Sequence, residues 1–139
     1  MPTPEDRIRE LGLTLPEPMI LPDNIGNSRV PYLRVGDLLY VGGHASRIEQ
    51  VFIVGKLGDT MNTEQGIEAA RSAALATLTS VKAALGDLDK VVRIVRVYGM
   101  INTAPDYKEH PLVINGASEL LIEVFGERGV HTRAAVGMA

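Results

Sequence analysis

The chain has 139 residues, a length typical of one domain with a single core, and its 14 basic and 17 acidic residues give a net charge of −3. The absence of cysteine excludes disulfides, thiolate metal sites and a cysteine nucleophile, while the scarcity of aromatic residues and clustered basic residues argues against nucleic-acid binding. No apolar window is long enough for a membrane span and residues 1–6 lack a leader pattern, so we expect a soluble cytoplasmic protein.

The first sixty residues predict one short helix followed by strands. Acidic residues open a helix at about residues 4–11, which Gly12 and the following prolines end. Residues 16–31 are rich in Pro, Asn, Gly and Ser and predict an irregular connection. Apolar runs at 31–35 and 38–41 flank Gly36-Asp37, which indicates a hairpin, and residues 51–57 predict a third strand.

The rest of the chain predicts two long helices and two strands. Apolar residues recur every three or four positions over residues 63–85, where Asn62 and Gln65 resemble a capping box and Gly86 is a stop signal. Residues 91–100 are rich in β-branched side chains and predict a long strand. A second helix is predicted at 110–125, and a last strand begins at about residue 131. The expected buried stripe of the second helix is Val113, Ala117, Leu120 or Leu121, and Val124.

This order of elements predicts an α+β fold with two layers. Right-handed crossovers place both long helices on the same face of the sheet, so the second face has no cover from this chain. The 91–100 strand is apolar at both parities, as in a strand that is buried on both sides. We therefore expect another copy of the subunit on the second face, and the alternative is a monomer whose sheet is partly wet.

The last predicted strand carries the most informative polar residue, Arg133. Strand alternation puts His131, Arg133, Ala135 and Gly137 on one face, so the guanidinium has small neighbours and space beside it. We expect the opposite set to pack under the helices, namely Thr132, Ala134, Val136 and Met138. A planar fork of donors beside open space matches a carboxylate, although an ordinary edge-strand arginine in water would show the same pattern.

Motifs spread over the chain resemble the RidA/YjgF family. In order they are Gly42-Gly43-His44 after an apolar strand, the 91–100 strand leading to Asn102 and Asp106-Tyr107, Ile114-Asn115, and Arg133-x-x-Val136. The resemblance covers residues 29–139, and residues 1–28, with the leading helix and the irregular connection, resemble a longer-headed branch.

The resemblance implies a chorismate-mutase-like mixed sheet with two main helices on one face. It also implies a homotrimer with clefts between subunits and no cofactor. The implied reaction is hydrolytic deamination of a reactive enamine or imine to a 2-keto acid and ammonia, acting on a small carboxylate-bearing metabolite.

Particular residues follow from the same resemblance. Arg133 matches the arginine that holds the substrate carboxylate, and we predict it as the catalytic residue. Gly43 matches a glycine whose backbone approaches the ligand, Tyr32 a tyrosine that reaches a neighbouring cleft, and Asn115 a helix asparagine near that cleft. The alternatives are a strand-ending glycine, a packing tyrosine and an exposed helix asparagine.

Three departures from the family pattern qualify the predicted activity. Ala135 stands where many members have cysteine, and His44 follows Gly43 where many have glutamine. His44 is a candidate for substrate binding and proton transfer, or else a solvated loop histidine. The family continues into one more strand with a glutamate that positions water, whereas this sequence stops at Ala139. We therefore expect a truncated chain, or else water activation that comes from elsewhere or is absent.

Other kinds of site find little support in the sequence. His44, His110 and His131 are far apart and form no short ligand pair, so no metal site is predicted. Two rival functions stay open. The first is a non-catalytic small-molecule-binding homotrimer of the same fold, and the second is a ribonuclease, a label attached to some relatives, against which the acidic pI argues.

Overall fold

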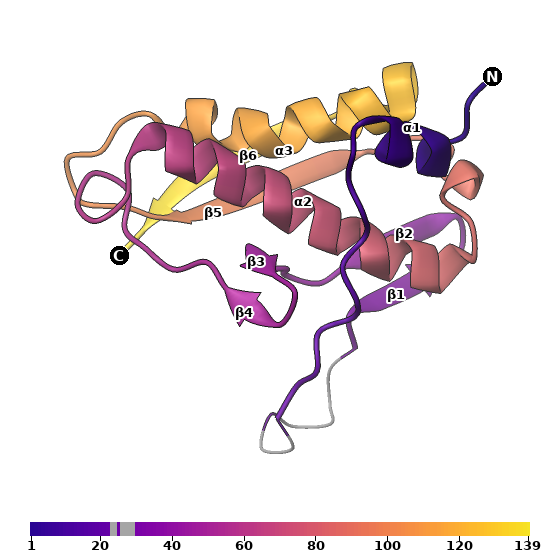
Figure 1. The fold of residues 1–139 in the computed structure, drawn as a ribbon, viewed down its shortest axis with the longest axis horizontal. Coiled ribbons are helices and arrows are strands. Elements are labelled where there is room, and N and C mark those ends of the chain that lie inside the picture. Colours follow the sequence, from indigo (N-terminus) through magenta and orange to yellow (C-terminus); the bar gives the residue numbers. More distant parts are fainter. Residues whose placement is uncertain (23–24, 26–29) are drawn as a thin grey trace.

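The structure is a computed structural model that describes residues 1–22, 25 and 30–139. Two long helices lie side by side in front of the strands, and a short N-terminal helix packs at one end (Figure 1). The elements in chain order are α1 (Pro4–Glu10), β1 (Tyr32–Val35), β2 (Leu38–Val41), β3 (Arg47–Ile48), β4 (Val51–Phe52), α2 (Thr63–Leu85), η1 (Leu88–Lys90), β5 (Arg96–Asn102), α3 (His110–Phe125), η2 (Gly126–Gly129) and β6 (Thr132–Met138). This is the expected α+β fold with both main helices on one face.

The strands pair two by two. β1 and β2 form the expected hairpin around Gly36-Asp37, and Gly36 has a φ of 60°, which suits the first central position of a type II′ turn. β3 and β4 are also antiparallel, whereas β5 and β6 are parallel and are joined by the crossover through α3. The parallel register runs from Arg96 opposite Thr132 to Asn102 opposite Met138.

Two strand predictions are wrong in extent. The strand expected at 91–100 begins only at Arg96 and continues to Asn102. Before it, the Ile94 N–H donates to the Arg128 carbonyl of η2, and of the described residues 91–95 only the Val95 carbonyl, which accepts the Thr132 N–H, bonds to β6. The strand expected at 51–57 is only Val51–Phe52, and Leu57 then forms an isolated bridge with Thr103. Of the predicted 16–31 connection, residues 23–24 and 26–29 lie outside the described residues.

The capping box predicted at the start of α2 is confirmed, and α1 begins with a capping box that was not predicted. The Asn62 side chain accepts from the Gln65 N–H while the Gln65 side chain accepts from the Asn62 N–H, which satisfies two free donors at the start of α2. Gly86 ends this helix in the left-handed region with a φ of 82°. At α1, Thr3 and Asp6 form a second reciprocal capping box.

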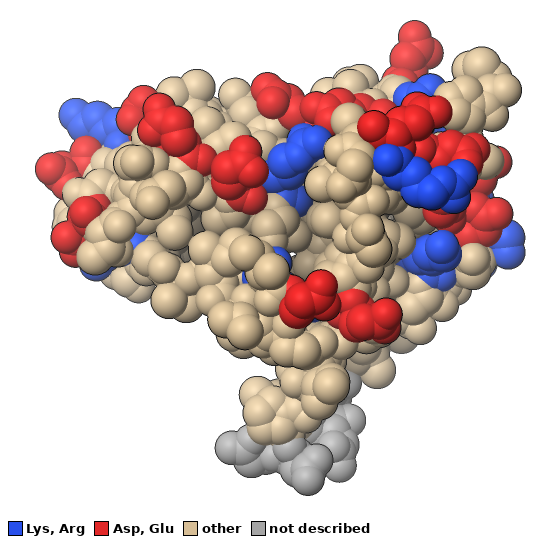
Figure 2. Space-filling view, in the orientation of Figure 1, with Lys and Arg blue, Asp and Glu red and all other residues tan. Residues whose placement is uncertain are grey.

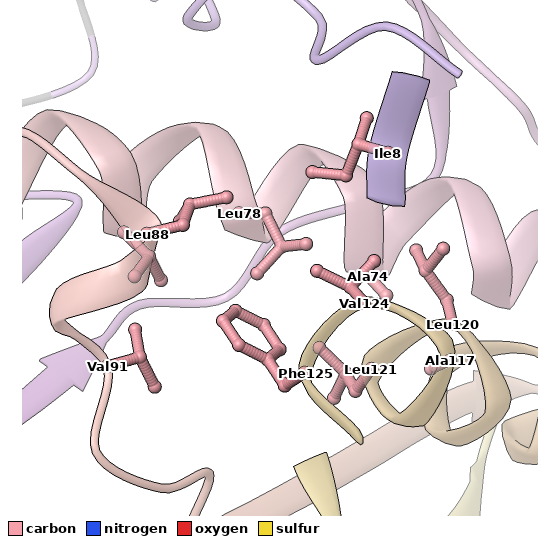
Figure 3. Packing of buried hydrophobic residues seen from close by; sticks show 11 residues of the cluster. Ile8, Ala74, Leu78, Leu88, Val91, Ala117, Leu120, Leu121, Val124 and Phe125 are labelled. Carbon is pink, nitrogen blue, oxygen red and sulfur yellow. The ribbon is translucent and has the colours of Figure 1, made fainter. Parts of the chain in front are cut away.

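The main core lies where α1, α2 and α3 meet (Figure 3). Leu78 of α2 and Leu120 and Val124 of α3 are almost completely buried there, and Leu88 closes one end. The predicted buried stripe of α3 is confirmed. Ile8 of α1 belongs to the same cluster, so the leading helix contributes to the core.

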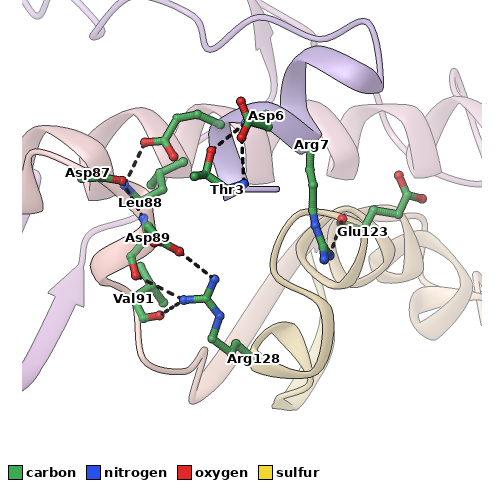
Figure 4. A network of polar contacts seen from close by, with 10 residues as sticks. Thr3, Asp6, Arg7, Asp87, Leu88, Asp89, Val91, Glu123 and Arg128 are labelled. Carbon is green, nitrogen blue, oxygen red and sulfur yellow. Dashed lines mark hydrogen bonds and ion pairs between the residues drawn. The ribbon is translucent and has the colours of Figure 1, made fainter. Parts of the chain in front are cut away.

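Polar contacts fasten the same end of the molecule (Figure 4). Arg128 donates to the carbonyls of Asp89 and Val91 and pairs with the Asp89 carboxylate at 3.1 Å. From α1, Glu5 accepts the Leu88 N–H. These contacts hold η1 and η2 together, which fixes the positions where β5 and β6 begin.

The sheet β5–β6 has one covered and one uncovered face. Val97, Gly99 and Ile101 face α3, and register places Arg133, Ala135 and Gly137 beside them on that face. The expectation that Thr132, Ala134, Val136 and Met138 pack under the helices is therefore wrong. They share the outer face with Tyr98 and Met100, which are 53% and 58% exposed in the single chain.

Gly116 is where α2 and α3 approach most tightly. A Cβ there would lie 2.0 Å from the Ile67 carbonyl oxygen, and backbone of a packed helix cannot move aside cheaply. We expect Gly116→Ala to lower the free energy of unfolding by about 1–3 kcal/mol, despite the better helix propensity of alanine. Urea unfolding measures this.

Gly99→Ala is the matched comparison. Its added methyl would meet Ile114 Cδ1 at 2.2 Å, a flexible side-chain end that can rotate away. The Gly99 variant should lose less stability than the Gly116 variant. If both variants lose the same free energy of unfolding, the close backbone contact between α2 and α3 at Gly116 is no more sensitive to an added methyl than the side-chain contact at Gly99.

The capping box of α1 predicts an acid-sensitive contribution to stability. Hydrogen bonds with the Thr3 backbone and hydroxyl lower the pKa of Asp6 below its ordinary value, and the nearby positive charge of Arg9 lowers it further. A carboxyl group whose pKa is lowered by folding stabilises the folded state at pH values above its ordinary pKa. This contribution is lost as the pH falls through the pKa of the folded state. We expect wild type to be more stable than Asp6→Asn at pH 7, with a difference that shrinks as the pH falls and the Asp6 carboxylate is protonated. A difference that stays constant as the pH is lowered would contradict this.

Candidate functional site

Arg133 of β6 lies against the first two turns of α3 and donates to three neutral acceptors. Its Nη1 donates to Asn115 Oδ1 at 2.8 Å and to Ser118 Oγ at 3.2 Å, and its Nη2 donates to the Pro111 carbonyl at 3.3 Å. These partners recur at helical spacing, so they form one face of α3. The guanidinium is therefore held in a fixed orientation.

Missing side chains on the strands let α3 come this close. A Cβ at Gly99 would lie 2.2 Å from Ile114 Cδ1, and a Cβ at Gly137 would lie 2.5 Å from His110 Nε2. Both glycines are on the face under α3, on adjacent strands. Because the helix rests on these bare positions, short side chains such as Asn115 and Ser118 reach the arginine.

The charge of Arg133 is not neutralised within the described chain. None of the carboxylates in the described ranges lies within 4.0 Å of its guanidinium. Three contacts engage Nη1 and Nη2, which leaves Nε–H and one Nη2 hydrogen of an exposed residue. Two such donors match the two oxygens of a carboxylate.

Arg47 shows that neutral partners alone do not define an anion site. Its guanidinium donates to the carbonyls of Glu49 and Glu17 at 2.5 and 2.8 Å, and the residue is only 6% exposed. It has no open edge for a ligand and instead ties the 16–20 segment to the β3–β4 turn. Arg133 differs because it is exposed.

A second layer of polar groups supports the Arg133 site. The Ser118 hydroxyl lies 2.9 Å from His131 Nε2, and His131 Nδ1 lies 2.5 Å from the Gly129 carbonyl. Strand alternation placed His131 on the same face as Arg133, whereas Ser118 and Pro111 were not predicted as site residues. The missed signal was the i, i+4, i+7 spacing of Pro111, Asn115 and Ser118.

The structure brings Asn115 and Arg133 together but keeps the other predicted site residues apart from them. Tyr32 lies on β1, and Gly43 and His44 follow β2; neither strand contacts α3 or β6. Both His44 ring nitrogens are engaged, Nδ1 with the Gly42 carbonyl and Nε2 with Ser80 Oγ, each at 2.7 Å. The predicted binding roles of Tyr32, Gly43 and His44 stay predictions.

Two open pockets lie near the ends of the strands and helices. One of about 610 Å³ at the starts of α2 and α3 is lined by Asn115 and by the acids Glu64, Glu109 and Glu119, which disfavour an anionic ligand. The other, of about 400 Å³, lies beside His110 and the end of β6. Neither is lined by Arg133.

Charge and composition limit other kinds of site. On the helical face, basic side chains are scattered among acidic ones (Figure 2). Within the described ranges, no group of three or more His, Asp or Glu side chains is arranged to hold a metal ion. No helix in this part of the chain is long and apolar enough to cross a membrane.

Comparison with known proteins gives one consistent answer. Residues 5–137 match the family described as "YjgF/chorismate mutase-like, putative endoribonuclease". Protein TCP17 of Trypanosoma cruzi is 37% identical over 134 residues, which cover 95% of this chain and 81% of that protein.

Solved structures agree in fold. Atu1372 from Agrobacterium tumefaciens, described as of unknown function, is 40% identical with a TM-score of 0.88, covering 99% of this chain and 82% of that one. A "putative endoribonuclease" from Shewanella oneidensis MR-1 is 35% identical with a TM-score of 0.92, covering 98% and 88%. Their folds extend the likeness over nearly the whole chain.

Proposed function

Because the chain belongs to the YjgF/chorismate mutase-like family, we propose that it hydrolyses a reactive enamine or imine of a 2-amino acid to a 2-keto acid and ammonia. In this proposal Arg133 binds the substrate carboxylate, and Asn115 helps to hold Arg133 in place. The site lies at an interface between copies of the subunit in a homotrimer.

One observation carries the proposal. The Arg133 guanidinium is fixed by three neutral acceptors of α3, has no carboxylate within 4.0 Å in the described part of the chain, and keeps an exposed edge. A cation that is oriented but not neutralised favours an anionic ligand. A planar carboxylate that accepts two N–H bonds suits this edge better than a single point charge does.

The reaction needs no change of oxidation state. In the imino acid, water adds its oxygen to the carbon of the C=N bond, and its protons pass to nitrogen. The C–N bond then breaks, ammonia leaves, and the carbonyl of the 2-keto acid forms. Such imines hydrolyse unaided, so orientation by a fixed carboxylate anchor with modest acid–base help of about 10²–10⁴-fold is sufficient.

Self-association supplies the rest of the proposed cleft. The outer face of β5–β6 exposes Tyr98, Met100 and Met138, and the β1–β2 hairpin exposes further apolar side chains. Such a face is unusual for a monomer and suits burial against another copy. We assign Tyr32, Gly43 and His44 to the wall of a neighbouring subunit's cleft, since their own strands do not contact α3 or β6.

The name of the matched family suggests ribonuclease activity as the second candidate. RNA cleavage calls for a surface that attracts phosphates, yet this chain has a net charge of −3. Basic side chains on the helical face are scattered rather than clustered (Figure 2). We therefore favour a small carboxylate as the ligand, with binding without turnover as the remaining alternative.

Replacing Arg133 should remove the proposed activity. An amino-acid oxidase generates 2-iminobutyrate in the cuvette, and semicarbazide competes with the protein for the imine. We expect wild type to suppress semicarbazone formation while Arg133→Ala loses about 10- to 100-fold in potency, as for one lost charged hydrogen-bonding partner. Arg133→Lys should recover only part, because a lysine cannot bind bidentately.

Arg9→Ala is the charge-matched control, because Arg9 is an exposed arginine on α1 that pairs with Asp6. It should behave as wild type. Suppression that survives Arg133→Ala would refute the assignment. Wild type that binds 2-oxobutyrate without suppressing the semicarbazone would favour the non-catalytic alternative, and RNA cleavage that is lost in Arg133→Ala would favour the ribonuclease.

The proposed interface has its own test. Met100→Glu places a charge on the outer face of β5, where the single chain tolerates it but an assembled face would bury it. We expect light scattering after gel filtration to show a trimer for wild type and a smaller species for Met100→Glu. Leu11→Glu, after α1, is the control and should stay trimeric. An unchanged mass for Met100→Glu would remove this face from the interface.

A further inference from the structure

Two Gly-x-His turns in this chain form the same pair of hydrogen bonds. In each, the histidine Nδ1 meets the carbonyl two residues earlier and Nε2 meets a serine of a main helix: His44 with Gly42 and Ser80, His131 with Gly129 and Ser118. They differ in what the serine does next. Ser118 also accepts from Arg133, whereas Ser80 contacts only His44 among the hydrogen bonds of the described residues.

The partners of His131 determine the direction of every bond. A carbonyl can only accept, so Nδ1 carries the hydrogen, and in the neutral ring Nε2 is then an acceptor. In this form of the ring the Ser118 hydroxyl donates to Nε2. Its oxygen therefore presents a lone pair to Arg133 Nη1 at 3.2 Å. The chain of donors runs from Arg133 through Ser118 and His131 to the Gly129 carbonyl.

This chain of hydrogen bonds rests on a rigid base. A Cβ at Gly129 would lie 2.2 Å from the Leu121 carbonyl oxygen, so the backbone there is packed against α3 with no room for a side chain. Ser118 is 8% exposed and sits on a helix whose neighbouring side chains form the core. Because both Gly129 and Ser118 are held by packing, the Ser118 oxygen has a fixed position and limits the orientation of the guanidinium.

We propose that Ser118 and His131 are positioning residues that hold Arg133 with its free edge toward the carboxylate of a 2-imino or 2-keto acid. The inference rests on the proposed function, because it concerns the same anchor. Asn115 and Ser118 both accept from Nη1, and the Pro111 carbonyl accepts from Nη2. His131 acts only through Ser118, by setting the direction of the hydroxyl hydrogen.

The proposal predicts a defect in ligand affinity that is separate from folding. Without the Ser118 oxygen, Nη1 has one partner fewer and the guanidinium can turn about its long side chain. We expect Ser118→Ala to weaken binding of 2-oxobutyrate, a stable keto acid, by about 5- to 20-fold in calorimetric titration, in line with one hydrogen bond to a charged group. His131→Phe should act in the same direction.

Two variants separate positioning from general loss of packing. His131→Gln can present an amide oxygen near the position of Nε2, so it should recover part of the affinity that His131→Phe loses. Thr79→Val removes another buried helix hydroxyl, which donates to the Pro16 carbonyl at 2.8 Å, and should lower stability without changing affinity. Side-chain ¹H–¹⁵N spectra should show hydrogen on Nδ1 of His131, with Nε2 shifted in Ser118→Ala.

The outcomes distinguish this inference from the proposed function. If wild type does not bind 2-oxobutyrate, the carboxylate-anchor proposal and the inference built on it both fail. If wild type binds and Arg133→Ala does not, while Ser118→Ala and His131→Phe keep full affinity, only the positioning role is overturned. A His131 that carries its hydrogen on Nε2 overturns it as well.

Discussion

The close seating of α3 on the parallel pair β5–β6 is the constraint on which the site depends. Gly99 and Gly137 offer no side chain to the helix, so Ile114 and His110 of α3 pack closely against these strand positions. Asn115 and Ser118 have short side chains and reach Arg133 only because of this approach. A side chain at either glycine would collide with Ile114 or His110, which would have to move to make room.

All the hydrogen-bond partners of the Arg133 guanidinium in the described chain are neutral. It donates to two side-chain oxygens and one carbonyl, so its positive charge is not balanced by a carboxylate of the described residues. Arg47 has the same kind of partners but is buried by them. Arg47 and Arg133 thus differ in their exposure and not in the type of acceptor, which is why we propose ligand binding for Arg133 alone.

The family assignment and the exposed sheet face point to assembly as the next level of organisation. Residues that the family resemblance ties to the ligand lie on β1 and after β2, apart from α3 and β6. The apolar outer face of β5–β6 and the hairpin supply the surface that would bring copies together. In this view the incomplete site and the uncovered sheet have one common explanation.

Local patterns in the sequence determined the helices, their caps, the hairpin and the family, because propensity, capping and turn signals act between neighbouring residues. Alternation also determined that Arg133, Ala135 and Gly137 share a face of the sheet. It could not determine which face α3 covers, because an alternating pattern separates the two faces of a strand without showing on which of them a helix packs. Only the tertiary structure decided that, because the crossover and the bare glycines set the position of α3. It likewise revealed that Ser118 of α3 contacts Arg133 and that His131 contacts Ser118, because the tertiary fold sets which elements lie next to each other.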